Sequence, residues 1–135
     1  MLKDIKRVIG IIGTRRRDNP SAYKLVEKKF LDIYEEGDFI CSGGCAKGGD
    51  RFAEAIAKKY GVPILIIYPN WKKFGKGGGF VRNTDIAKNS DLIIACVVHP
   101  EEGIVEVLNR KKGGAEDTLK KYVGFHKDGW RIELV

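Results

Sequence analysis

The chain has 135 residues, of which 43% are hydrophobic and 32% are charged, a size and composition typical of one globular domain spanning residues 1–135. No apolar run approaches the ~20 residues that a membrane-spanning helix needs. The N-terminal segment MLKDIKRV lacks the apolar core of a signal peptide. These features exclude an integral membrane protein and favour a cytoplasmic one. The net charge of +7 is compatible with an anionic partner, although many lysines fall on the expected solvent faces of helices.

Cysteine usage points to reduced thiols. The three cysteines are Cys41, Cys45 and Cys96, and they cannot all pair within one chain. Cys41 and Cys45 have a spacing that suits a metal, but no second Cys or His pair accompanies them. We therefore expect neither a disulfide framework nor a metal site.

Five short apolar segments, rich in β-branched residues, recur along the chain. Their continuous apolar character predicts strands that are buried on both faces, as in a parallel sheet covered by helices. The expected strands cover residues 7–14, 38–44, 62–69, 91–98 and 130–135.

Helical patterns lie between these strands. The first is expected over residues 20–36, beginning at Pro20 with Asn19 as its N-cap. Others are expected over about 49–60, 78–89 and 113–124, and the glycine-rich segment 70–80 is expected to be a mobile loop. The alternation predicts an α/β, doubly wound, mainly parallel five-stranded sheet with helices on both faces, a Rossmann-like fold. Ligands of such a fold bind beyond the carboxyl ends of the strands.

Three glycine-rich or polar loops are expected at these carboxyl ends: GTRRRDN, SGGCAKGGD and KKGGAEDT, the last after the fourth strand. Exposed backbone amides and helix N-termini favour a phosphate, so a phosphorylated ligand suits the loops better than a neutral metabolite. The alternative is that the glycines only permit tight turns and close packing of helix on sheet. The candidate nucleotide-binding residues in the loops are Gly13, Thr14, Arg15, Ser42, Gly43, Gly44, Lys47, Gly48, Gly49, Asp50, Gly113, Gly114 and Thr118.

Two common nucleotide-binding motifs are absent from the sequence. No loop matches G-x-G-x-x-G or G-x-x-x-x-G-K-[ST], so neither an ordinary dinucleotide fold nor a P-loop is supported. Asp50 can be a simple helix cap or can contact a ligand ribose or Arg82. Trp71 and Phe74 either cover one end of the core or stack on a base.

Four blocks of the sequence carry a family resemblance: IIGTRR, CSGGCAKGGDRFAEAIAKKYGVP, GFVRNTDIAKNSDLIIA and KKGGAEDTL. In their order and spacing, from about residue 7 to 124, they resemble the SLOG superfamily of Rossmann-like proteins, especially its YspA/YpsA-related branch. The resemblance implies binding of a nucleoside monophosphate or of an NAD- or ADP-ribose-derived ligand. It adds Arg82 and Asn83 to the candidate binding residues and implies a homo-oligomer, commonly a dimer.

The LOG phosphoribohydrolases of that superfamily resemble one another in an Arg and in a PGGxGTxxE loop whose final Glu works with it. Arg82 matches the Arg, but either alignment of the loop places a lysine, Lys120 or Lys121, where the Glu stands. An ammonium group repels the positive charge that develops during glycoside cleavage, so hydrolysis assisted at this position is not expected. Asp50, Glu116 or Asp117 could substitute, which makes Arg82, Asp50 and Glu116 the candidate catalytic residues.

The sequence therefore predicts a nucleotide sensor or binding protein with no required cofactor. One alternative is a LOG-like nucleoside 5′-monophosphate phosphoribohydrolase. The other is a binder of single-stranded nucleic acid that resembles DprA, a member of the same superfamily. A continuous basic groove with steep salt dependence is expected only for the nucleic-acid binder.

Overall fold

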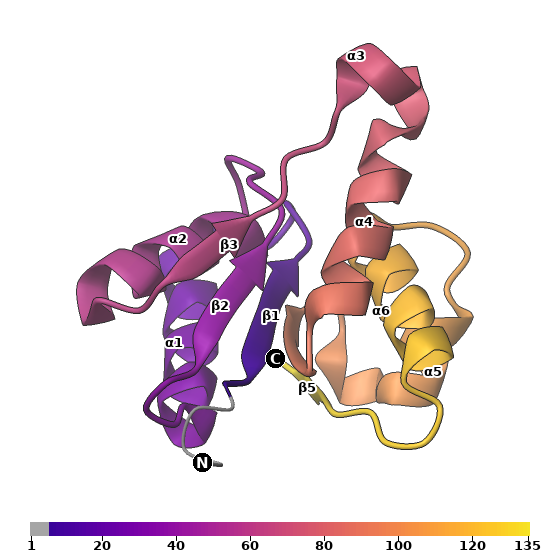
Figure 1. Cartoon of the computed structure of the whole chain (residues 1–135). Helices are drawn as coiled ribbons and strands as arrows, with labels where there is room; N and C mark the ends of the chain where they lie inside the picture. Colours follow the sequence, from indigo (N-terminus) through magenta and orange to yellow (C-terminus); the bar gives the residue numbers. More distant parts are fainter. Residues whose placement is uncertain (1–5) are drawn as a thin grey trace.

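The protein is an α/β structure with three layers in the computed structural model, which describes residues 6–135 (Figure 1). Five strands form one sheet in the order β3-β2-β1-β4-β5, and every neighbouring pair is parallel. The strands are β1 (Val8–Gly13), β2 (Phe39–Ser42), β3 (Ile64–Ile66), β4 (Leu92–Cys96) and β5 (Ile132–Leu134). The predicted doubly wound fold is confirmed, and its sheet is wholly parallel.

Helices cover both faces of the sheet. The α-helices are α1 (Pro20–Ile33), α2 (Gly49–Tyr60), α3 (Trp71–Phe74), α4 (Gly78–Asn89), α5 (Ile104–Asn109) and α6 (Gly114–Phe125), and two 3₁₀ turns are η2 (Gly75–Gly77) and η3 (Pro100–Glu102). α1 and α2 pack on one face around Val26, Phe30 and Phe52. α4 and α6 pack on the other around Ile86 and Tyr122. Each face therefore has its own apolar core, and the central strands β1, β2 and β4 are largely buried, as their continuous apolar character predicts. The prediction of burial on both faces is wrong for the edge strands β3 and β5, which are only partly buried; Leu65 of β3 is 44% exposed.

The start of α1 follows the sequence closely. Asn19 is the N-cap, its Oδ1 accepts a hydrogen bond from the amide of Ala22 at 2.8 Å, and Pro20 is the first helical residue. The predicted cap and start are confirmed, whereas the helix ends at Ile33 and not at residue 36.

Two helices were not expected. α3 occupies part of the segment predicted as an irregular loop, and it stands away from the sheet at the far end of α4 (Figure 1). The sequence had suggested that the KKGGAEDT loop directly follows the fourth strand. This prediction is wrong, because η3 and α5 lie between β4 and that loop.

The strand order places a topological switch point between β1 and β4. β1 pairs with β2 on one side and with β4 on the other, so the chain winds from β1 outward in opposite directions. Crevices outside the carboxyl ends of strands at such a point are the usual ligand sites of open α/β sheets. The loops after β1 and β2 and the starts of α4 and α6 lie at this edge.

Candidate functional site

The loops after β1 and β2 pack backbone against backbone. A Cβ atom on Gly49 would lie closer than 3.0 Å to the nitrogen of Gly13, and one on Gly48 would overlap the carbonyl oxygen of Thr14. Gly48 also has a φ of +75°, which residues with a side chain rarely adopt. These two glycines are therefore required for the fit of one loop on the other, whatever else the loops bind.

The carboxylate of Asp18 is hydrogen-bonded to the backbone amide of Gly48, the N-cap residue of α2. Its Oδ1 accepts hydrogen bonds from the Gly48 amide at 2.7 Å and from Arg51 Nε at 2.8 Å. The bond from Gly48, followed by that from Arg51, holds the pKa of Asp18 below its usual range. The Gly48 amide, which was predicted to face a phosphate, thus already has an anionic partner from within the chain.

Ser42 and Asp50 lie inside the second loop. Both residues are buried. Oδ2 of Asp50 accepts from the Cys45 amide at 3.0 Å, and its Oδ1 lies 2.8 Å from the Ser42 hydroxyl, which is also 2.6 Å from the Ile11 carbonyl oxygen. Since a hydroxyl carries one hydrogen, it can donate to only one of these oxygens at a time. Asp50 therefore braces the loop through Ser42 and the Cys45 amide. Its side chain forms no capping hydrogen bond at the start of α2, so the simple helix-cap interpretation is wrong, whereas the predicted proximity to Arg82 is found.

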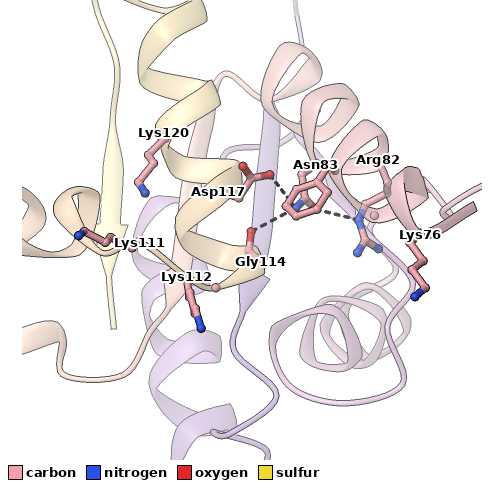
Figure 2. A pocket seen from close by; sticks show the side chains of 11 residues that line it. Lys76, Arg82, Asn83, Lys111, Lys112, Gly114, Asp117 and Lys120 are labelled. Atoms are coloured by element: carbon pink, nitrogen blue, oxygen red, sulfur yellow. Dashed lines mark hydrogen bonds between the residues drawn. The ribbon is translucent and has the colours of Figure 1, made fainter. Parts of the chain in front are cut away.

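Arg82 and Asn83 join the second loop to the start of α6 (Figure 2). Arg82 Nη1 donates to the Gly43 carbonyl oxygen at 2.6 Å and lies 4.0 Å from Asp50 Oδ2, while its Nε donates to Asn83 Oδ1 at 2.9 Å. Asn83 Nδ2 in turn donates to the Gly114 carbonyl oxygen and to Asp117 Oδ2 at 3.1 Å. The predicted pair Arg82–Asn83 is thus held at the junction of two predicted loops.

A cleft of about 430 Å³ opens beside this junction, between α4 and α6. Figure 2 shows lysines of the α5–α6 segment on one side of it and Lys76 on the other. Phe80, a residue that is 60% exposed, lines the cleft, and Asp117 is the carboxylate of the lining. The cations of the lining are Lys76, Arg82, Lys111, Lys112 and Lys120.

These cations differ in whether their side chains already form hydrogen bonds or ion pairs within the protein. Arg82 donates to Gly43, and Lys120 Nζ donates to the carbonyl oxygen of Arg110. Within residues 6–135, the side chains of Lys76, Lys111 and Lys112 form neither a hydrogen bond nor an ion pair, and all three are exposed. A group of cations without protein partners around one cleft is suited to an anion of the ligand.

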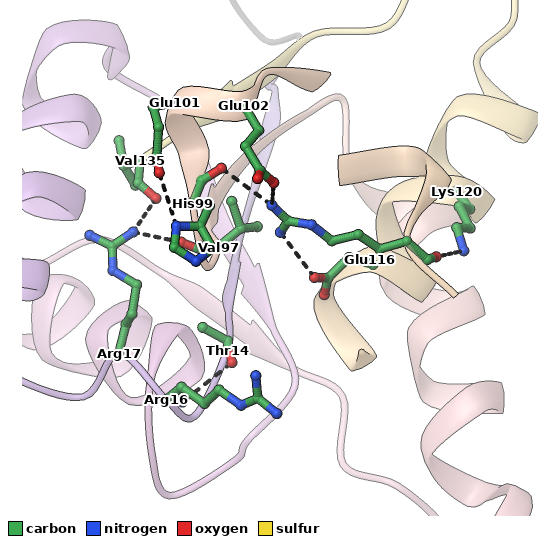
Figure 3. A network of polar contacts seen from close by, with 11 residues as sticks. Thr14, Arg16, Arg17, Val97, His99, Glu101, Glu102, Glu116, Lys120 and Val135 are labelled. Atoms are coloured by element: carbon green, nitrogen blue, oxygen red, sulfur yellow. Dashed lines mark hydrogen bonds and ion pairs between the residues drawn. The ribbon is translucent and has the colours of Figure 1, made fainter. Parts of the chain in front are cut away.

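The remaining predicted residues of the first two loops lie elsewhere. Arg15 and Lys47 line a second cleft, of about 440 Å³, together with Arg16, Cys45 and Ala46. Arg17 is turned inward, and its Nη1 donates to the carbonyl oxygens of Val97 at 2.8 Å and Val135 at 2.5 Å (Figure 3). Of the predicted binding residues, four line the cleft between α4 and α6 and two line the second cleft. The others line neither: Gly13, Thr14, Ser42, Gly43, Gly44, Gly48, Gly49, Asp50 and Thr118.

Glu116 and Thr118 face away from the cleft between α4 and α6. Glu116 is buried and lies 3.4 Å from Arg110 Nη1, and Arg110 also pairs with Glu102 at 2.6 Å (Figure 3). The hydrogen bond with Glu102, and then that with Glu116, raises the pKa of Arg110 against the opposing effect of burial. The Thr118 hydroxyl donates to the Gly114 carbonyl oxygen within its own helix at 3.0 Å. Both side chains stabilise the start of α6 and its surroundings.

The cleft residues missed as candidates include Lys76, Phe80, Lys111 and Lys112. Lys111 and Lys112 directly precede the glycine pair of the third loop, and Phe80 lies two residues before Arg82. Their position next to predicted residues in the sequence was the only feature that could have identified them as candidates. Sequence alone gave no means of telling which neighbours face the same opening.

No match is found for this chain among protein-family models, curated proteins or solved structures. Within residues 6–135, no helix has both the length and the apolar character needed to cross a membrane. The same part of the chain holds no group of three or more His, Cys, Asp or Glu side chains placed to bind a metal ion.

Proposed function

We propose that this chain binds a nucleotide or a nucleotide-derived ligand in the cleft between α4 and α6, as a sensor or binding protein. The observation that carries the proposal is the combination of Lys76, Lys111 and Lys112, which have no partner in residues 6–135, with the exposed ring of Phe80. Lysines bind phosphate oxygens as point charges, and aromatic faces stack on bases. A nucleoside monophosphate or an ADP-ribose-like compound offers both groups at once.

The position of the cleft supports the same ligand class. Arg82 and Asn83 at its floor, and Gly113 and Gly114 at its edge, belong to the sequence blocks that resemble the SLOG superfamily. Arg82 is fixed by Gly43 and Asn83, so a ligand oxygen would meet a guanidinium that is already oriented. The cleft also lies at the carboxyl edge of the sheet, where ligands of this architecture bind.

The alternative function is that of a hydrolase, which would need a carboxylate in the cleft. Lys120 and Lys121, which stand at the position of the LOG glutamate, are engaged by the Arg110 carbonyl oxygen and by Phe80 and Asp117. Among the candidate carboxylates only Asp117 lines the cleft, and it accepts hydrogen bonds from both Asn83 and Lys121. Asp117 is thus the residue that a hydrolytic mechanism would have to use, because it alone could meet an oxocarbenium-like centre there.

Binding is tested by a thermal-shift screen over AMP, ADP-ribose, NAD and cyclic nucleotides, followed by calorimetry with the best ligand. A ligand present at 100 times its Kd stabilises the folded state by about 2.7 kcal/mol, which such a screen detects. The double variant Lys111→Glu/Lys112→Glu is expected to weaken binding at least tenfold, since two cations become like charges to the phosphate. The matched control is Lys24→Glu/Lys28→Glu on the exposed side of α1.

Equal loss of affinity in both double variants would show that overall charge, and not this cleft, governs binding. Failure of every nucleotide to stabilise the wild type would refute the proposal. Turnover is tested separately with stoichiometric protein, AMP and chromatographic detection of free adenine. Multiple turnovers that disappear in Asp117→Asn would establish the hydrolase in place of the sensor.

A further inference from the structure

Lys111 and Lys112 lie in a bend between α5 and α6 that their own backbone does not hold in place. In the part of the chain that the structure describes, residues 6–135, neither residue forms a backbone hydrogen bond. The bend is therefore fixed only at its two ends, Arg110 and Gly113. Because both lysines line the cleft between α4 and α6, whatever fixes these ends also decides where the two cations lie.

Arg110, the first end of the bend, is held by several partners. Its Nη2 lies 2.6 Å from Glu102 Oε1 and donates to the His99 carbonyl oxygen at 3.3 Å, and its Nη1 lies 3.4 Å from Glu116 Oε2. Its own carbonyl oxygen accepts a hydrogen bond from Lys120 Nζ. Figure 3 shows the guanidinium between Glu102 and Glu116. Since two carboxylates already pair with this guanidinium, it stabilises the bend and is not left over for a ligand.

Glu116 connects the second end of the bend to the first. Its side chain is only 10% exposed, and a Cβ atom on Gly113 would overlap its carboxylate. Gly113 has a φ of +124°, which residues with a side chain rarely adopt, and its carbonyl oxygen accepts from the Asp117 amide at 3.0 Å. One carboxylate thus lies beside the backbone of Gly113 and pairs with Arg110.

We propose that Arg110 and Glu116 are positioning residues for the nucleotide: they hold residues 110–113 so that Lys111 and Lys112 face a phosphate in the cleft. The inference rests on the proposed function, and it gives Glu116 a role other than the catalytic one expected from the sequence. Neither Arg110 nor Glu116 lines the cleft, so both act through the lysines. A bend that is already ordered loses less entropy when the ligand binds.

Glu116→Ala is the sharpest test, because two explanations predict opposite results. If Glu116 acted only through its charge, removing a carboxylate near a phosphate would strengthen binding. If it positions the lysines, the same change should weaken binding by about three- to thirtyfold, since the ligand must then order the bend. Calorimetry with AMP and with ADP-ribose measures the Kd. Glu116→Gln should recover part of the affinity, because its amide oxygen can still accept from Arg110.

The matched control breaks another buried ion pair far from the cleft. Arg7 Nη2 lies 2.7 Å from Oδ2 of Asp38, which is 4% exposed and directly precedes β2, at the amino edge of the sheet. Asp38→Ala is expected to lower the Tm but to leave the Kd for either nucleotide within about twofold of the wild type. Arg110→Gln should lower the Tm and also weaken binding, as Glu116→Ala does.

Order in the free protein separates positioning from a general loss of stability. ¹⁵N relaxation reports the ps–ns order of the amides of residues 111–113. In Arg110→Gln and Glu116→Ala, their order parameters are expected to fall from about 0.85 to about 0.6 or less. In Asp38→Ala they should stay at the wild-type values.

Two results would overturn the inference while leaving the proposed function intact. One is a wild-type or tighter Kd in folded Glu116→Ala, and the other is unchanged order at residues 111–113 in both variants. If Glu116→Ala does not fold, Arg110→Lys decides, because lysine keeps the charge but cannot reach all the partners of Arg110; unchanged affinity would then refute the positioning role. If the wild type binds neither AMP nor ADP-ribose, the proposed function fails and the positioning role fails with it.

Discussion

Replacing Gly49 by Ala is expected to destabilise the protein although alanine is the better helix former. Gly49 is the first residue of α2, and the added Cβ would lie closer than 3.0 Å to three backbone atoms of β1: the nitrogen of Gly13 and the carbonyl carbon and oxygen of Ile12. None of these atoms can rotate away, so α2 or β1 must shift. Overpacking of this kind typically costs about 1–3 kcal/mol. For a domain of this size, that corresponds to a fall in Tm of roughly 3 to 15 °C.

Gly124→Ala is the matched control. Gly124 lies inside α6, and a Cβ there would meet nothing within 4 Å. The substitution is expected to stabilise the protein by up to about 1 kcal/mol, because alanine loses less backbone entropy in a helix. The assay is thermal unfolding followed by circular dichroism for the wild type and both variants. A Gly49→Ala variant whose Tm lies within about 1 °C of the wild type would refute the packing role assigned to this glycine.

Three further predictions follow from the loops and the thiols. Asp18→Asn should destabilise the protein at pH 7. The pKa of Asp18 is lowered on folding from its ordinary value of 3.8, so its ionised carboxylate stabilises the folded state at pH values above 3.8. The difference between wild type and variant in urea midpoint should therefore shrink as the pH falls from 5 to 2, and a constant difference would contradict the assignment. Cys45 should react first with a disulfide reagent in the native protein, since Cys41 and Cys96 are buried and burial raises the pKa of Cys41 to about 11. Fast reaction of more than one thiol per native chain would argue against this burial. A ligand in the cleft between α4 and α6 should leave the rate of Cys45 labelling unchanged, because Cys45 lines the other cleft, and strong protection would place the ligand there.

The fold could be predicted because its signals are local and repeated. Continuous apolar runs identified all five strands, and the alternation with helices fixed a parallel arrangement. α3 was missed because a helix of four residues leaves no periodic pattern, and α5 was missed for a similar reason. The predicted helix over 78–89 is confirmed, since α4 begins at Gly78 although residues 77–79 are all glycine. The contact of the Trp71 ring with Gly78 was not predicted. That contact depends on tertiary structure and has no local signature.

The site could be predicted only in part. Arg82 and Asn83 do lie at the junction of the second and third loops, as their sequence block suggested. The engagement of the Gly48 amide by Asp18 could not be foreseen, because it depends on how two distant loops fold over each other. The same holds for Glu116, whose pairing with Arg110 turns it away from the cleft. Residue type and position along the chain indicated which loops matter, but not which side chains face the opening.

Amide chemical-shift mapping tests the central claim most directly. ADP-ribose, or the best ligand from the thermal-shift screen, is titrated into ¹⁵N-labelled protein and the shifts are assigned. The account predicts that the largest saturable shifts fall on Phe80, Arg82, Gly113 and Gly114, which line the cleft between α4 and α6, with none on the exposed side of α1. Shifts confined to Arg15, Arg16 and residues 45–47, or no shifts at saturating nucleotide, would contradict it.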